Sequence, residues 1–251
     1  MERVLQAQIP ANNVGLWWLG QEGYLLKTPS GLTLAVDPYL SNSCGTGPGS
    51  CRMIPVPIEP EDLRVDLYLC THDHRDHLDP ETLTRYGAKD STTFVGPRNV
   101  CRHFRELGIS AERIVRVDAG EEIALRGVTI RGTFALATDY DSLDGEGFLL
   151  TFQNGRKMYI SGDTAWSNLL VGVARYRPHL MCVVINGGYG NLDPWEAALL
   201  TAAVRPEVVT PCHYGMFPGN TIDPNRFVAA LKEIACDVPC RILEVMQPFL
   251  V

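Results

Sequence analysis

Short apolar runs separated by glycine and proline make up the first part of the chain. They are Val14–Leu19, Tyr24–Lys27 and Leu32–Val36. Apolar runs of this length between turn-forming residues are typical of β-strands, so we predict an antiparallel meander. A segment rich in proline and glycine follows, from Asp37 to about Leu63, and it has no hydrophobic periodicity. A loop this long inside a compact domain is usually a lid or a binding loop.

From Asp66 onward, apolar strands alternate with helical segments. Several predicted helices begin at an Asp-Pro pair, in which the aspartate caps free backbone N–H groups and the proline fits the first turn. One helix is predicted to start at Asp79, further helices to span Pro97–Leu107, Asp193–Val204 and Asp223–Ala235, and strands to span Asp66–Cys70, Phe94–Val95, Ile114–Val117, Glu122–Leu125, Val128–Phe134, Phe148–Phe152, Lys157–Ile160, Met181–Ile185, Glu207–Thr210 and Arg241–Val245. No Pro- or Ser-rich linker divides the chain. We therefore expect one layered α/β domain over residues 1–251, with two similar halves that each form a sheet covered by helices.

The composition is that of an ordinary globular domain. Hydrophobic residues make up 45% and charged residues 20% of the 251 residues, and a chain of this length can bury a substantial core. Apolar stretches such as Met181–Ile185 are too short to span a bilayer. The N-terminal MERVLQAQIP lacks the apolar core of a secretory signal. We expect a cytoplasmic protein without a membrane partner.

The charge and the cysteines narrow the classes of partner. The formal net charge of -7 argues against broad binding to nucleic acid or to an anionic membrane, although a small anionic substrate stays compatible with it. The 8 cysteines form no dense framework, and in a chain without an export signal they are expected to be reduced thiols. The expected partner is a small-molecule substrate, and a homo-oligomer stays open.

One segment carries most of the recognisable chemistry. It is Thr71-His72-Asp73-His74-Arg75-Asp76-His77, directly after a predicted strand. His72 and His74 are two residues apart, so an extended backbone directs both imidazoles to one side, and Asp76 with His77 can face a neighbouring point after a bend. Imidazole and carboxylate suit a borderline divalent cation, and two ligand pairs on one loop can hold two ions about 3.5–4 Å apart. A solvent-exposed polar loop is the alternative.

Further side chains of ligand type stand where apolar strands end. Asp163 follows the run Lys157–Ile160, and His213 follows Glu207–Thr210. Sites in α/β folds gather beyond one end of the strands, so these side chains can meet the histidine cluster, with Asp163 bridging two ions and His213 completing the second. A turn aspartate and a structural histidine are the alternatives. Asp37, at another strand end, is expected to orient the metal-binding loop rather than to ligate.

Residues that contact substrate are harder to identify. The candidates are Tyr189 in a glycine-rich segment, Tyr214 beside His213, and Arg52 in the long loop. For both tyrosines, packing in the core or in a loop is the favoured alternative. Arg52 is equally well explained as a solvated guanidinium.

The pattern His72-x-His74-x-Asp76-His77, followed by Leu78-Asp79, resembles the signature of the metallo-β-lactamase superfamily. From about Val14 to Phe227, the chain also resembles the ascorbate-6-phosphate lactonase branch of this superfamily. The segments that carry this second resemblance are Trp17-Trp18-Leu19-Gly20, Thr71–Asp79, Phe94-Val95-Gly96-Pro97, Ser161-Gly162-Asp163 and Pro211-x-His213 with Asn220.

The resemblance implies an αββα sandwich with a metal site at one edge, between the two sheets. It also implies a distribution of the ligands over two ions. His72 and His74 would bind the first ion, and Asp163 would bridge the two. The second ion would be bound by Asp76, His77 and His213.

The sequence departs from the superfamily after Val128–Phe134, where a third histidine is usual. The segment here, Ala135–Asp141, contains none. The lactonase branch also lacks this histidine and uses an aspartate nearby, so Asp139 is the candidate ligand and Asp141 the alternative. An oxygen ligand would shift the preference from zinc toward manganese, or toward a single ion. We expect one or two divalent cations, Mn²⁺ or Zn²⁺, with iron also compatible.

The expected reaction is hydrolysis by metal-bound hydroxide, with Asp76 orienting or deprotonating the water as well as binding metal. The resemblance implies a lactonase that acts on a small sugar-acid lactone, phosphorylated or not. A phosphodiesterase on the same metal site is the first alternative. The second is a non-catalytic metal-binding protein that acts as a sensor or partner.

Overall fold

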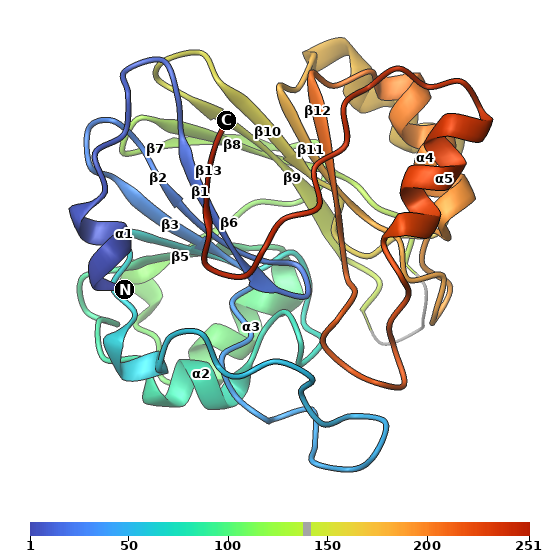
Figure 1. The fold of residues 1–251 in the computed structure, drawn as a ribbon. Helices are drawn as coiled ribbons and strands as arrows, with labels where there is room; N and C mark the ends of the chain where they lie inside the picture. The colour runs from blue at the N-terminus through green and yellow to red at the C-terminus, as the bar shows by residue number, and fades with distance from the viewer. Residues whose placement is uncertain (138–141) are drawn as a thin grey trace.

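Two β-sheets lie face to face in the computed structural model of the protein, which describes residues 1–137 and 142–251 (Figure 1). The first sheet has the strand order β13-β1-β2-β3-β4-β5-β6, and the second has the order β12-β11-β10-β9-β8-β7. Helices α1 to α3 pack on the outer side of the first sheet, and α4 and α5 on the outer side of the second. This arrangement confirms the layered αββα sandwich expected from the sequence.

The elements follow the predicted pattern along most of the chain. The first sheet contains β1 (Gly15–Gly20), β2 (Gly23–Lys27), β3 (Thr33–Val36), β4 (Leu67–Leu69), β5 (Thr93–Gly96), β6 (Ile114–Arg116) and β13 (Pro248–Leu250). The second contains β7 (Glu122–Leu125), β8 (Val128–Phe134), β9 (Glu146–Phe152), β10 (Lys157–Ile160), β11 (Leu180–Val184) and β12 (Val208–Cys212). The α-helices are α1 (Glu2–Gln6), α2 (Pro80–Arg85), α3 (Arg98–Glu106), α4 (Pro194–Val204) and α5 (Asn225–Glu233), and the 3₁₀ helices are η1 (Pro60–Asp62), η2 (Ala111–Arg113) and η3 (Asn168–Tyr176).

Strands β1 to β4 of the first sheet are buried on both faces, which explains their continuous apolar runs. Along β1, Leu16 and Trp18 pack between the two sheets, whereas Trp17 and Leu19 pack in the cluster under the helices. Successive side chains of a strand point to opposite faces. Strand β1 therefore contributes side chains to two hydrophobic clusters, one on each face of the sheet.

The direction of the strands brings their carboxyl ends to one edge of the sandwich. Strands β1, β2 and β3 form the predicted antiparallel meander, β3 to β6 are parallel, and β10 to β12 are parallel. The loops that follow β3, β4, β10, β11 and β12 therefore start at the same edge, where sites of α/β proteins are usually built.

The prediction of a final strand over Arg241–Val245 is wrong. This part of the chain crosses from one sheet to the other (Figure 1): the Arg241 N–H donates to the Val209 carbonyl on β12, and Val245 forms an isolated bridge with Trp18 on β1. Because its two ends pair with different sheets, no continuous ladder forms. The final strand is instead β13, which pairs antiparallel with β1.

No helix among the residues that the structure describes has both the length and the apolarity needed to cross a lipid bilayer.

Candidate metal centre

The histidine-rich loop after β4 is a tight turn that closes onto its own backbone. The N–H groups of His77 and Leu78 both donate to the His74 carbonyl, at 3.0 and 2.8 Å. Downstream, Asp79 caps α2 by accepting from the Glu81 N–H at 3.0 Å, and it also accepts from the Ser41 hydroxyl at 2.9 Å. The loop is thereby fixed at its C-terminal end. Within it, the Nε2 atom of His72 lies 3.0 Å from the Nδ1 atom of His74.

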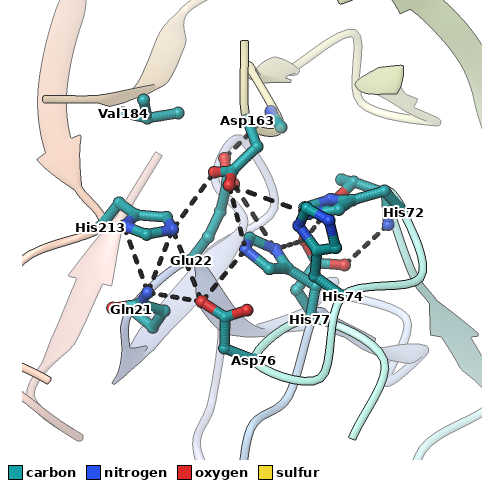
Figure 2. Close-up of polar contacts among 12 residues, drawn as sticks. Gln21, Glu22, His72, His74, Asp76, His77, Asp163, Val184 and His213 are labelled. Carbon is teal, nitrogen blue, oxygen red and sulfur yellow. Dashed lines mark hydrogen bonds and ion pairs between the residues drawn. The ribbon is translucent and has the colours of Figure 1, made fainter. Parts of the chain in front are cut away.

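Two side chains from the second sheet meet this loop, as Figure 2 shows. Asp163 follows β10, and His213 follows β12 with a left-handed backbone (φ 62). The Oδ2 atom of Asp163 lies 3.8 Å from His72 Nε2 and 3.7 Å from His77 Nε2, and its Oδ1 atom lies 3.3 Å from His213 Nε2. Asp163 thus lies between the two histidine groups, in the position expected of a bridging carboxylate.

Asp76 closes the other side of the cluster. Its Oδ2 atom lies 3.6 Å from His77 Nε2 and 3.6 Å from His213 Nε2. The structure therefore brings all six predicted ligand side chains to one centre. The predicted ligand atoms form two adjacent groups, each within 4.8 Å: His72, His74 and Asp163 in one, and Asp76, His77 and His213 in the other.

The spacing of these atoms fits a divalent cation better than it fits hydrogen bonds. Ligand atoms about 2.0–2.2 Å from a zinc-sized ion lie roughly 3–4 Å from one another. His77 Nε2 and Asp163 Oδ1 are buried and lack a hydrogen-bond partner among the described residues. Buried polar atoms without partners are rare in folded proteins. Two such atoms facing one centre, with imidazole and carboxylate donors around them, suit a bound ion.

The electrostatics of the cluster point the same way. Burial lowers the pKa of His72 well below its usual range, with His77 acting in the same direction. Burial opposes the charge of Asp163, but His213 and His77 outweigh it and hold the pKa of this carboxyl well below its usual range. Burial also disfavours the charged form of His77, but the negative charges of Asp76 and Asp163 outweigh it and raise the pKa of this imidazole. The carboxylates thus attract positive charge to the centre of the cluster.

Asp37 lies behind the cluster, where the sequence analysis expected an orienting residue. Its Oδ2 atom accepts from the Nδ1–H of His77 at 2.8 Å, and the carboxylate also accepts from the N–H of Thr71 at 2.8 Å and from its hydroxyl at 2.6 Å. A hydrogen bond at Nδ1 fixes the ring orientation and leaves Nε2 for a metal. His77 therefore presents Nε2 to the centre.

Sequence reasoning missed two residues of the site, Gln21 and Glu22. Both lie in the turn between β1 and β2 and are fully buried. The Gln21 amide nitrogen donates to Asp76 Oδ2 at 2.8 Å and lies 3.1 Å from His213 Nε2. The only signal in the sequence was a pair of polar residues between Gly20 and Gly23, which is also typical of an exposed hairpin turn.

Glu22 is a buried carboxylate that contacts the neighbours of two candidate ligands. Its Oε1 atom accepts from the Gly162 N–H at 3.0 Å and from the Cys212 thiol at 3.7 Å. Its Oε2 atom lies 3.8 Å from His77 Nδ1 and has no hydrogen-bond partner within the described ranges. Burial raises the pKa of this carboxyl well above its usual range. Glu22 thereby ties the turn before Asp163 to the strand end before His213.

A cavity of about 470 Å³ opens above the cluster. Four candidate ligands line its inner end, namely His74, Asp76, Asp163 and His213, and its outer walls are formed by Cys44, Gly49, Ser50, Tyr189, Asn191, Phe217 and Asn220. The candidate ligands therefore lie where a small molecule can reach them.

Only one of the three substrate-contact candidates lines this cavity. Tyr189 does, with 75% of its side chain exposed. Tyr214 is buried and packs on Trp18, with ring centroids 5.0 Å apart, so it has the core role given as its alternative. Arg52 does not line the cavity: it is half-buried, and its guanidinium donates to backbone carbonyls, including that of Tyr39 at 2.8 Å. Asp139 and Asp141 lie outside the described residues.

Comparison with known proteins agrees with this geometry. Residues 34–214 match the family model of the β-lactamase superfamily domain. The chain belongs to the metallo-β-lactamase superfamily. Its relatives there include a UPF0173 metal-dependent hydrolase from Anaeromyxobacter sp. (strain K), 30% identical over 246 residues that cover 92% of this chain and 84% of the relative. Another UPF0173 metal-dependent hydrolase, from Aeropyrum pernix, is 31% identical over 242 residues, which cover 91% of this chain and 94% of the relative.

Solved structures of other hydrolases share the fold of this chain at lower sequence identity. A metallo hydrolase from Ignicoccus hospitalis is 23% identical, with a TM-score of 0.77 over 95% of this chain and 98% of that chain. An isothiocyanate hydrolase from Delia radicum gut bacteria is 18% identical, with a TM-score of 0.77 over 94% of this chain and 100% of that chain. These likenesses confirm the metallo-β-lactamase fold, and they leave the substrate of this chain open.

Proposed function

We propose that this protein hydrolyses a small lactone or carboxylic ester with one or two divalent cations, Mn²⁺ or Zn²⁺, with iron also compatible. The observation that carries the proposal is the convergence of six imidazole and carboxylate side chains from both sheets, four of which line the inner end of one cavity. The membership of the superfamily supports hydrolysis. The resemblance of several segments to ascorbate-6-phosphate lactonases favours a lactone as the substrate.

The side chains divide naturally into two metal-binding groups. His72 and His74 would hold one cation, and Asp76, His77 and His213 the other, with the Asp163 carboxylate shared between them. Bound cations of this kind acidify a water molecule and polarise a scissile carbonyl.

Asp76 is the side chain best placed to handle a proton. It lines the cavity, and the Gln21 amide fixes its orientation by donating to Oδ2 at 2.8 Å. Its other oxygen, Oδ1, would then accept a proton from the attacking water and later donate it to the leaving alkoxide oxygen. Ring opening of a lactone needs such a transfer, because the alkoxide leaving group is strongly basic.

The proposal is tested with a panel of lactones, carboxylic esters and bis-p-nitrophenyl phosphate. The protein is purified without a metal-affinity tag, its metal content is measured by elemental analysis, and it is assayed with added manganese or zinc. We expect one to two equivalents of metal and hydrolysis of at least one lactone or ester. The variant His74→Ala should lower the metal content and abolish the hydrolysis.

Two outcomes contradict the proposal in different ways. Turnover of the phosphodiester alone would replace the lactonase by a phosphodiesterase on the same centre. Bound metal without turnover of any compound would instead favour a metal-binding sensor.

A further inference from the structure

The residues that the structure describes in the wall of the cavity, beyond the candidate ligands, have uncharged side chains. Three loops supply it, after β3, β11 and β12, and its members are Cys44, Gly49, Ser50, Tyr189, Asn191, Phe217 and Asn220. The charged or titratable groups at the inner end are the candidate ligands themselves. Among the described residues that line this cavity there is no lysine and no arginine. A phosphate or carboxylate group of a substrate that lies along this wall would therefore find no cationic partner there.

The arginines closest to this wall in the sequence are held elsewhere. Arg52 donates to the carbonyls of Tyr39, Ser41 and Ile54, at 2.8, 3.3 and 3.2 Å. Arg75 is exposed and donates to the Ser43 carbonyl at 3.3 Å. Both guanidiniums thus bond the backbone of the loop after β3, and neither lines the cavity.

Arginines do gather on this protein, but at a different surface. Arg98, Arg102 and Arg105 follow one another along α3 and line a separate pocket with Asn99, Leu143 and Asp144. The uncharged wall of the catalytic cavity is therefore a local property and does not follow from the composition of the chain.

The polar groups of the wall suit neutral hydroxyl and carbonyl groups. Asn191 is buried, and its Oδ1 atom lacks a hydrogen-bond partner among the described residues. Asn220 accepts at Oδ1 from the Asn186 amide at 2.7 Å, so its own amide nitrogen remains as a donor. Phe217 and the exposed ring of Tyr189 add apolar faces. Carboxamides with aromatic rings recognise an uncharged, hydroxylated ring through hydrogen bonds and apolar contact.

We propose that this cavity selects an uncharged, hydroxylated lactone or ester and discriminates against its phosphorylated counterpart. This inference rests on the proposed function and names its substrate class. A phosphate placed on the wall would lose its hydration without gaining a cationic partner there. The neutral substrate does not meet this penalty.

Binding is measured by calorimetry on the metal-loaded protein, with ligands that cannot be hydrolysed as lactones. The matched pair is 1,5-anhydroglucitol and its 6-phosphate, and methyl phosphate reports the affinity of the metals for a phosphate group alone. We expect the neutral ring to bind, and the phosphorylated ring to bind no more tightly than methyl phosphate. Turnover of a neutral lactone should exceed that of its phosphate ester at least tenfold in kcat/KM.

A change of charge on the wall gives the matched control. Ser50→Lys places an ammonium group at the cavity, whereas Ser50→Met adds similar length without charge. We expect the lysine variant alone to bind the phosphorylated ring at least tenfold more tightly than the wild type does.

The inference is overturned if the wild type binds the phosphorylated ring more tightly than the neutral ring or than methyl phosphate, or if the neutral ring does not bind. These binding results do not depend on turnover. A protein that binds the neutral ring but cleaves only the phosphodiester would contradict the proposed function and leave the preference for neutral ligands supported.

Discussion

The two halves of the candidate metal centre are built in different ways. The half on the first sheet comes from one loop, residues 72–77, which bonds to its own backbone through the His74 carbonyl and ends at the helix cap Asp79. The half on the second sheet consists of Asp163 and His213, which stand on separate loops. Their backbones are held by distant residues: Glu22 accepts from the N–H of Gly162, 140 residues away, and the Gln21 carbonyl accepts from the N–H of His213.

The difference shows which half of the metal centre depends on the packing of the two sheets. Local turns and a helix cap hold residues 74–79 of the loop half, whereas its N-terminal end also bonds the second sheet, where the Glu146 N–H donates to the Thr71 carbonyl. The strand-end half depends on the packing of the two sheets and on the buried turn at Gln21 and Glu22. Because Asp163 contacts histidines of both groups, any displacement of the second sheet should weaken both metal-binding groups at once.

The substitution Asp163→Asn tests the coupling of the two halves and has the largest expected effect. Loss of the shared carboxylate should remove at least half of the bound metal and lower kcat/KM by roughly a thousandfold or more, because both groups lose a ligand. Elemental analysis and the hydrolysis assay measure this. Asp73→Asn is the matched control, since Asp73 is in the same loop but contacts His103 and Ser142. If Asp163→Asn kept its full metal content, the bridging role would be wrong.

Removal of the metal with a chelator compares the halves directly. At a free metal concentration of 100 to 1,000 times the Kd, bound metal adds about 3–4 kcal/mol to the free energy of unfolding, and chelation should remove it. In hydrogen exchange, we expect amides near residues 161–163 and 211–214 to lose more protection than those of residues 74–78. An equal loss in both halves would show that the histidine loop also depends on the metal.

Glu22 tests what holds the strand-end half. Glu22→Ala removes the acceptor for the Gly162 N–H and should weaken metal binding tenfold or more, as substitutions behind metal ligands commonly do. Glu22→Gln keeps an oxygen acceptor and should stay within about threefold of the wild type. Titration with Co²⁺, followed by its visible spectrum, measures both. Equal losses in the two variants would mean that the charge of Glu22 matters rather than its hydrogen bond.

Glu146 lies at the seam between the halves and should have the smallest effect. Its N–H donates to the Thr71 carbonyl at 3.1 Å, and burial raises the pKa of its carboxyl to about 10. The carboxyl is thus protonated in the folded chain but ionised in the unfolded chain above about pH 4.5. Stability therefore falls as the pH rises from that value toward 10.

The variant Glu146→Gln removes this dependence on pH. We expect it to be more stable than the wild type by about 1–3 kcal/mol at pH 8 and equal to it near pH 4. Urea unfolding at the two pH values measures the difference. A difference that does not change with pH would show that the carboxyl is already ionised in the folded protein.

The amino-acid sequence by itself determined the loop half and much of the fold. His72, His74, Asp76 and His77 are adjacent in the chain, so their common direction follows from local backbone geometry. Apolar runs and Asp-Pro caps report local structure in the same way, and most strands and helices were predicted. Asp163 and His213 could be proposed because parallel strands end at one edge of a sheet.

Only the tertiary structure decided which distant groups meet. A polar turn such as Gln21-Glu22 faces either water or the interior, and the packing of the second sheet against it settles which. The crossing of residues 241–245 between sheets, the position of Arg52 on backbone carbonyls and the uncharged wall of the cavity have the same origin. Each depends on contacts between segments far apart in the chain, and hydrophobic periodicity carries no record of such contacts.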